Sequence, residues 1–168
     1  MTDRAPPGSD WVPVLAAPGN AFQERNLEVW ARLDGDEPVV GFRVLPHHCN
    51  PRKVCHGGMI MTFFDFLLPT LSRFDEDEDA DDSFTPTVSV TTNFLAPALL
   101  GDWLEGRATT LRRTNGLVFI DGVVSSGDTV VAQASGIFKR RRPDGRLAHT
   151  ATLLERMREA QRQQHPAE

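Results

Sequence analysis

The sequence predicts an α+β domain in which a curled antiparallel β-sheet surrounds one buried α-helix. Residues 58–68 are apolar almost all the way round a helix, and a helix without a wet face must be enclosed by other elements. A pair of strand-like segments precedes this stretch, and a run of β-branched, alternating segments follows it from Thr85. A helix and a sheet with these patterns have to pack on each other.

We divide the chain into three parts. Residues 1–9 are polar and contain two prolines and a glycine, which predicts a mobile N-terminal tail. Residues 10–149 have the length of a single domain with one core. Residues 150–168 predict an amphipathic surface helix and a tail, to which the pattern gives no chemistry. At the start of the domain, residues 10–17 are expected to form a helical or irregular lid, since Pro13 argues against a long helix.

The first strands are expected to form a hairpin. Residues 27–32 alternate in polarity, Asp34-Gly35-Asp36 indicates a turn, and residues 39–45 return as a second strand. Residues 46–51 contain two prolines and are therefore expected to be an irregular loop. The central helix follows this loop, and Pro69 should end or kink it, because proline lacks the N–H donor and clashes with the preceding turn.

The second half of the chain is predicted to be all strand. Residues 75–82 form a self-repelling acidic run, which is expected to be a solvated loop. Turn signals then separate four strands, at residues 87–95, 103–112, 117–125 and 129–139. Such a sheet has unsealed edges, so we expect dimerisation by pairing of edge strands.

Composition excludes several classes of function. The formal net charge of -5 provides no basic footprint for nucleic acid. There is no apolar run of about 18 residues and no signal-peptide core, so no membrane partner is expected and a cytoplasmic protein is predicted. Cys49 and Cys55 fit no zinc spacing and are expected to be free, partly buried thiols. His47, His48 and His56 lack a completing carboxylate, so no metal site is predicted.

The two ends of the apolar stretch differ in chemistry. His56-Gly57-Gly58 lets a ligand approach the backbone closely, and the first N–H groups of the helix, which have no intrahelical partner, point at it. This end can hold a developing oxyanion. Asp65 stands alone in the apolar helix and lies roughly 10 Å from Gly58, at about 1.5 Å per residue. One acyl group does not easily reach both within one chain, so a second subunit is expected to bring the second half of the site.

These residues resemble the hotdog-fold acyl-CoA thioesterases, in particular the branch with the phenylacetate-pathway and 4-hydroxybenzoyl-CoA thioesterases. The resemblance spans about residues 28–141 and rests on Asn50-Pro51, His56-Gly57-Gly58, Asp65 and TVSVTTNFLAPALLGDWLEG at residues 87–106. It implies a hotdog fold and hydrolysis of an acyl- or aryl-CoA to the free acid and CoA. It also implies that no cofactor is needed beyond the CoA of the substrate, that a homodimer is the minimal active unit, and that the assembly is a homotetramer.

The resemblance also implies roles for five residues. Asp65 matches the acidic residue that acts as a base or as a nucleophile, and Thr87 matches a small hydroxyl that orients water. Gly57 matches the residue whose backbone N–H polarises the thioester carbonyl, and Asn50 and His56 match positions that contact or frame this carbonyl. Burial disfavours a charged carboxylate, so a hydrogen-bond donor is needed to keep Asp65 ionised.

Coenzyme A carries phosphates that require cations. A basic cluster ends the last predicted strand, and another basic pair ends an earlier one, so we expect CoA contacts from Arg113, Lys139, Arg140 and Arg141. A solvated cationic strand end is the alternative interpretation. The sequence contains neither a P-loop nor a dinucleotide-binding glycine fingerprint.

Two other functions remain open from the sequence. A non-catalytic acyl-CoA-binding module would need the same pocket and basic rim but not Asp65. A hydratase or dehydratase would use an acid–base pair such as His56 and Asp65, although Gly57-Gly58 after the histidine favours the thioesterase pattern. Structural roles are also open: local donors satisfying Asp65, loop structuring by His56, and an ordinary strand position for Thr87. The acyl preference and the choice between base and nucleophile stay open.

Overall fold

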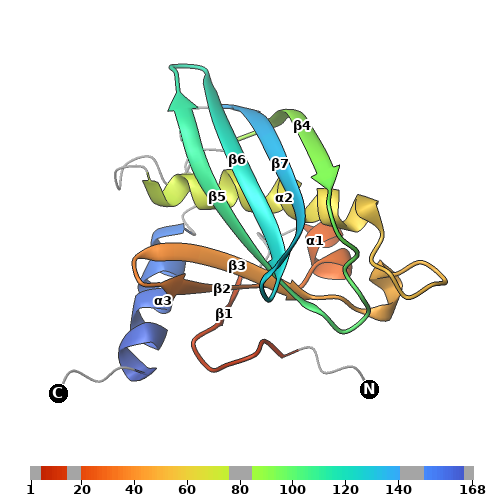
Figure 1. Ribbon diagram of the computed structural model, residues 1–168. Coiled ribbons are helices and arrows are strands. Elements are labelled where there is room, and N and C mark those ends of the chain that lie inside the picture. The colour runs from red at the N-terminus through yellow and green to blue at the C-terminus, as the bar shows by residue number, and fades with distance from the viewer. Residues whose placement is uncertain (1–4, 15–19, 76–84, 141–149, 165–168) are drawn as a thin grey trace.

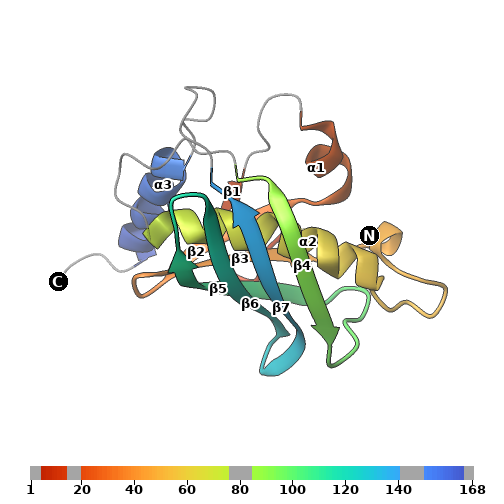
Figure 2. The ribbon, with the colours of Figure 1, turned by 90° about the horizontal axis from the view of Figure 1, so that it is seen from above.

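A computed structural model describes residues 5–14, 20–75, 85–140 and 150–164. In these residues a seven-stranded antiparallel sheet curls around α2 (Gly57–Ser72), as Figures 1 and 2 show from two directions. The predicted α+β class, a curled sheet around a central helix, is confirmed. The strand order in the sheet is β1-β2-β3-β5-β6-β7-β4.

The strands from Val29 onward agree with the predicted strands to within a few residues. The strands are β1 (Val12–Val14), β2 (Val29–Asp34), β3 (Glu37–Arg43), β4 (Thr87–Phe94), β5 (Trp103–Arg113), β6 (Leu117–Ser126) and β7 (Thr129–Lys139). Two further helices, α1 (Ala21–Asn26) and α3 (Thr150–Gln164), and two 3-10 turns, η1 (Pro46–His48) and η2 (Arg73–Asp75), complete the described chain. The helix α1, a short helix capped by the Asn20 side chain, was not predicted.

The core forms where α2 packs on the concave face of the sheet. The helix buries Ile60, Phe63, Phe64, Leu67, Leu68 and Leu71. Two glycines of the sheet allow this close approach: a Cβ at Gly106 would lie 2.9 Å from Leu67, and one at Gly122 would lie 2.5 Å from Leu68. Larger residues at these strand positions would push the helix off the sheet.

The predicted lid at residues 10–17 is wrong where the structure describes it. Val12 and Val14 form the edge strand β1, paired with Ala31 and Val29 of β2. An edge strand tolerates Pro13, because its missing N–H costs little there. Just before this strand, Trp11 is buried and packs edge-on against Trp103, with ring centroids 5.0 Å apart. The first residues of the domain therefore extend the sheet.

The irregular loop expected around Pro46 was also wrong, as was a helix end at Pro69, while a kink at Pro69, the other expected alternative, stays a prediction. Pro46 does not prevent regular structure but begins the 3-10 turn η1, at a helix position where its missing N–H is not needed. Pro69 does not end α2, which continues to Ser72. The last turn is fixed from both sides, since the Ser72 hydroxyl donates to the Pro69 carbonyl (3.0 Å) and Arg113 donates to the Ser72 carbonyl. Burial of the helix outweighs the cost of an internal proline, about 3 kcal/mol.

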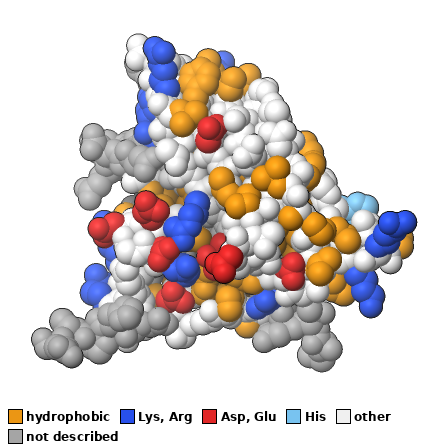
Figure 3. Space-filling model, viewed as in Figure 1, with side chains coloured by type: hydrophobic (Ala, Val, Ile, Leu, Met, Phe, Trp, Pro, Cys, Tyr) orange, Lys and Arg blue, Asp and Glu red, His pale blue; other side chains and the backbone are white. Residues whose placement is uncertain are grey.

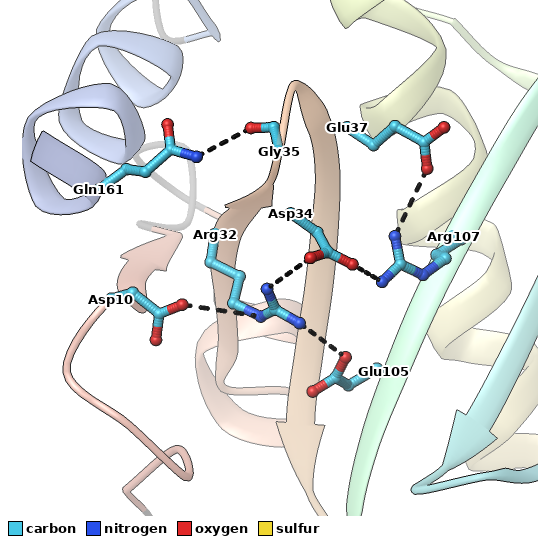
Figure 4. Close-up of polar contacts among 8 residues, drawn as sticks. All are labelled: Asp10, Arg32, Asp34, Gly35, Glu37, Glu105, Arg107 and Gln161. Atoms are coloured by element: carbon cyan, nitrogen blue, oxygen red, sulfur yellow. Dashed lines mark hydrogen bonds and ion pairs between the residues drawn. The ribbon is translucent and has the colours of Figure 1, made fainter. Parts of the chain in front are cut away.

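The helix α3 has one face in the core rather than lying wholly on the surface. Leu153 and Met157 are buried with the residues of β2 and α2. Gln161 fixes its far end by donating to the Gly35 carbonyl of the β2–β3 turn (2.9 Å), as Figure 4 shows. The helix α3 therefore packs against β1, β2 and η2 and contributes to the core.

An ion-pair network connects the strands beside this helix (Figure 4). Asp34 at the end of β2 accepts a hydrogen bond from Arg107 of β5 and lies 3.6 Å from Arg32. Arg32 also reaches Asp10 and Glu105, at 3.9 and 3.3 Å. The hydrogen bond from Arg107 holds the pKa of Asp34 below its ordinary value, while partial burial opposes this and the charges of both arginines reinforce it.

Candidate active site

The N-terminus of α2 presents backbone donors, as the sequence predicts. His56 is the N-cap residue, its side chain makes no capping bond, and its carbonyl accepts from the N–H groups of Met59 (2.9 Å) and Ile60 (3.2 Å). The N–H groups of Gly57 and Gly58 donate to no other residue in the part of the chain that the structure describes. An incoming carbonyl oxygen could therefore accept from them.

An aromatic ring covers Gly57 on the side of β4. A Cβ built on Gly57 would lie 3.0 Å from Cζ of Phe94, whereas one on Gly58 would meet nothing within 4 Å. Phe94 is 51% exposed, although it is a large apolar residue at the end of a strand. The sequence predicted Phe94 only as part of a strand. Phe94 lies two residues from Thr92 and therefore on the same face of β4, but only the fold shows that this residue touches Gly57.

The loop before α2 holds Asn50 in a defined orientation. Its side-chain Oδ1 accepts from the N–H groups of Arg52 (2.9 Å) and Val54 (3.3 Å). The loop is in turn attached to residues 98–100, where the Ala98 carbonyl accepts from the N–H of Cys55 (2.8 Å). With Oδ1 occupied, the amide Nδ2 of Asn50 is the group that can contact a substrate oxygen.

Asp65 and Thr87 are brought together by the fold. The Thr87 hydroxyl at the start of β4 donates to Oδ1 of Asp65 at 2.6 Å. The expectation that Asp65 is buried was wrong for the single chain, in which Asp65 and Met61 are exposed on the same side of α2. The sheet ends at β4 and leaves that side of the helix uncovered. Thr62, the other polar side chain within residues 58–68, donates to the Gly58 carbonyl (2.9 Å).

The two halves of the predicted site lie at opposite ends of β4. Thr87 pairs with Phe138 at one end of this strand and Phe94 pairs with Ala132 at the other. Asp65 is next to the first end and Gly57 is next to the second. From Gly58 to Asp65 the helix rises roughly 10 Å, at about 1.5 Å per residue. A single chain does not bring the carboxylate and the backbone donors into one site.

The predicted CoA-binding residues that the structure describes lie at the same end of neighbouring strands: Arg113 ends β5, and Lys139 and Arg140 lie at the end of β7, both beside the start of β6. Arg113 donates to the Ser72 carbonyl and to the Thr110 hydroxyl (3.1 Å), and Arg140 donates to the Thr114 carbonyl (3.1 Å). Lys139 is exposed at the end of β7. Arg141 lies outside the described residues, as does most of the acidic run at residues 75–82. Two of the arginines therefore also have structural contacts.

His48 behaves as a structural residue. His48 is 3% exposed, its Nδ1 accepts from the N–H of Leu45 (3.0 Å), and its Nε2 lies 2.9 Å from the Asn26 carbonyl, which requires the proton on Nε2. His47 and His48 line a cavity of about 320 Å³ next to α1, which neither Asp65 nor Thr87 borders. Among the residues that the structure describes, no group of His, Cys, Asp or Glu is placed to hold a metal ion.

Burial disfavours the thiolate form of both cysteines, and more strongly at Cys55. Burial raises the pKa of Cys55 to about 12, to which the neighbouring Cys49 contributes, and burial also raises the pKa of Cys49. A neutral thiol at Cys55 cannot act as the nucleophile for which His56 would be the base. The carboxylate of Asp65 is the candidate that remains in this region.

Comparison with known proteins identifies the family. Residues 53–133, which include Gly57, Asp65 and Thr87, match the Thioesterase superfamily. A protein of Pseudomonas aeruginosa whose name describes it as an esterase is 31% identical over 100 residues, which are 60% of this chain and 72% of the relative. The chain belongs to the thioesterase superfamily. It is therefore an enzyme of the thioester hydrolase class.

Solved structures share the fold. A phenylacetic acid degradation-related protein of Ralstonia eutropha JMP134 superposes with a TM-score of 0.61 at 24% identity, over 73% of this chain and 92% of that protein. A Bacillus halodurans protein solved with CoA gives a TM-score of 0.58 at 19% identity, over 66% and 72% of the two chains. The predicted hotdog fold is thus confirmed. In the described part of this thioesterase, every helix is too short or too polar to cross a membrane.

Proposed function

We propose that this thioesterase hydrolyses an acyl- or aryl-CoA to the free acid and CoA. The observation that carries the proposal is the hydrogen bond from Thr87 to Asp65 (2.6 Å), which orients a solvent-accessible carboxylate on the helix whose N-terminus offers free backbone donors. The comparison structure solved with CoA supports this substrate class.

The chemistry follows from these groups. Asp65 either removes a proton from water, whose oxygen then attacks the thioester carbon, or attacks this carbon itself to give an anhydride that water hydrolyses. The backbone N–H of Gly57 stabilises the oxyanion, and Asn50 and His56 frame the same carbonyl. The C–S bond breaks and the CoA thiolate leaves, taking a proton from solvent. No step needs a metal or a further cofactor.

The active unit in this proposal is a homodimer joined at β4. This edge strand exposes Val88 (59%) and Phe94 (51%), and Figure 3 shows hydrophobic side chains at the surface on the side where β4 lies. Antiparallel pairing about a two-fold axis through the middle of β4 would place Thr87 of one subunit opposite Phe94 of the other. Asp65 of the partner subunit would then face Gly57, which completes the site.

The CoA nucleotide is proposed to contact Arg113, Lys139, Arg140 and Arg141. Lys139 is exposed at the end of the sheet near Thr87, so a phosphate there would lie beside the Asp65 half of the site. A homotetramer built from two such dimers, acting in the cytoplasm, belongs to the same proposal.

The test compares wild type with Asp65→Asn on a panel of aryl- and fatty acyl-CoAs. Asparagine keeps an oxygen for Thr87 but loses the charge, so we expect thiol release to fall by about 10²–10⁴-fold while the melting temperature and CoA thioester binding are kept. Thiol release is corrected for the reaction of the dye with Cys49 and Cys55, measured on each protein without substrate.

Two outcomes would contradict the proposal. Full hydrolysis by a folded Asp65→Asn variant would remove Asp65 from the mechanism. Binding of CoA thioesters without release by the wild type would favour a non-catalytic binding module.

A further inference from the structure

Cys49 and Cys55 face each other across the small hairpin that precedes α2. They form an isolated antiparallel bridge, and both are free thiols. The flanking backbone bonds run from the Asn50 N–H to the Val54 carbonyl (2.9 Å) and from the His56 N–H to the His48 carbonyl (2.8 Å). Because these bonds join the neighbours and not the two cysteines, the cysteines are a non-hydrogen-bonded pair.

This type of pair has the spacing that a disulfide needs. The Cα atoms of a non-hydrogen-bonded pair are about 4.5 Å apart and its side chains lie on the same face. Disulfides span Cα separations of about 4.4–6.8 Å. In the reduced protein the two thiols donate weakly to different carbonyls, Cys49 to Leu45 (3.5 Å) and Cys55 to His56 (3.8 Å), so only side-chain rotation is required to join them.

We propose that Cys49 and Cys55 are a reversible disulfide site, oxidised by a small-molecule disulfide. The thiolate of Cys49 attacks one sulfur of the oxidant, forms a mixed disulfide and releases one small thiol. The Cys55 thiolate then attacks the Cys49 sulfur and releases the second small thiol. The two cysteines lose two protons and two electrons, and the oxidant is reduced to two thiols.

The order of these steps follows from exposure. Cys49 is partly exposed and Cys55 is 5% exposed, so the external disulfide reaches Cys49 first. The raised pKa of Cys55 slows the second step, which should accelerate as the pH rises. The bond closes residues 49–55, the loop that carries Asn50 and ends next to His56 and Gly57.

The experiment incubates the full chain with glutathione disulfide at mildly alkaline pH. We expect the intact mass to fall by two hydrogens and to return after treatment with dithiothreitol. Trypsin cuts after Arg43, Arg52, Lys53 and Arg73, so the oxidised protein should release the peptide of residues 44–52 linked to that of residues 54–73.

Single variants show which thiol reacts first. Cys55→Ala should accumulate glutathione on Cys49, and Cys49→Ala should remain unmodified under the same conditions. The proposal is overturned if native wild type stops at the Cys49 adduct. It is also overturned if native wild type stays reduced while the chain unfolded in guanidinium forms the linked peptides in the same buffer.

Discussion

The adjacent glycines at the start of α2 have different surroundings. The ring of Phe94 lies against Gly57, so that a Cβ on this residue would be 3.0 Å from Cζ of the ring. A Cβ on Gly58 would meet no atom within 4 Å. A methyl group on Gly57 must displace the ring or tilt the first turn of the helix, which moves the backbone N–H assigned to the oxyanion. A methyl group on Gly58 only improves helix propensity, by up to about 1 kcal/mol.

Gly57→Ala is therefore expected to lower kcat/KM by roughly 10–100-fold, since small misplacements of catalytic groups have effects of this size. Gly58→Ala should raise the melting temperature, which Gly57→Ala should not. The double variant Gly57→Ala/Phe94→Ala should recover part of the lost kcat/KM, because the obstructing ring is gone. Equal losses in the single and double variants would show that Phe94 is not the obstacle.

At this scale the sequence predicted more of the site's residues than of their surroundings. Asp65 and Thr87 were expected to act in one site, and the structure places them in contact. The exposure of Asp65 was not expected, because the apolar pattern of residues 58–68 predicts a helix that is enclosed on all sides, whereas the single chain leaves one side of α2 open. The contact of Phe94 with Gly57 depends on where β4 ends relative to α2, which no local pattern contains.

At the scale of elements, the ion-pair network of Figure 4 makes the joint between β2, β3 and β5 sensitive to acid. The pKa of Asp34 is lower in the folded than in the unfolded chain, chiefly through the hydrogen bond from Arg107. This stabilisation is fully present above the ordinary carboxyl pKa of 3.8 and is lost as the pH falls through the lower, folded value.

Asp34→Asn should therefore lower the stability at neutral pH, by about 0.2–1 kcal/mol for a half-exposed pair. The difference from wild type should shrink below pH 3.8. Thermal melts of both proteins from pH 7 to 3 measure it, with Asp36→Asn in the adjacent turn as the control. A difference that stays constant down to pH 3 would show that the Asp34 carboxylate does not stabilise the joint.

Elements were predictable where the pattern is local. Alternation and turn residues predicted β2, β3 and the four later strands within a few residues. β1 was missed because three residues with a central proline become a strand only against the free edge of β2. The continuation of α2 past Pro69 was missed because burial on the sheet, a tertiary effect, outweighs the local cost.

For the whole molecule, the exposed edge of β4 predicts how the assembly can be broken. Val88→Arg places a charge on this edge at a residue that is 59% exposed in one chain. We expect the variant to sediment as a monomer and to lose thioester hydrolysis, because Asp65 of the partner subunit no longer reaches Gly57. Val123→Arg, on the outer face of β6, is the matched control and should remain at least dimeric and active. An active Val88→Arg monomer would contradict the shared site.

The strand order also dictates a sequence of events during synthesis. β4 leaves the ribosome before β5 and β6, yet its partner within the chain is β7, which ends at Lys139. Until then β4 has an unpaired edge on both sides, and the apolar helix before it has only part of its sheet. The Asp65 half of the site therefore depends on β7, the last strand to be made. A nascent chain that is stopped before β7 exposes an aggregation-prone edge, and it folds only after β7 has left the ribosome.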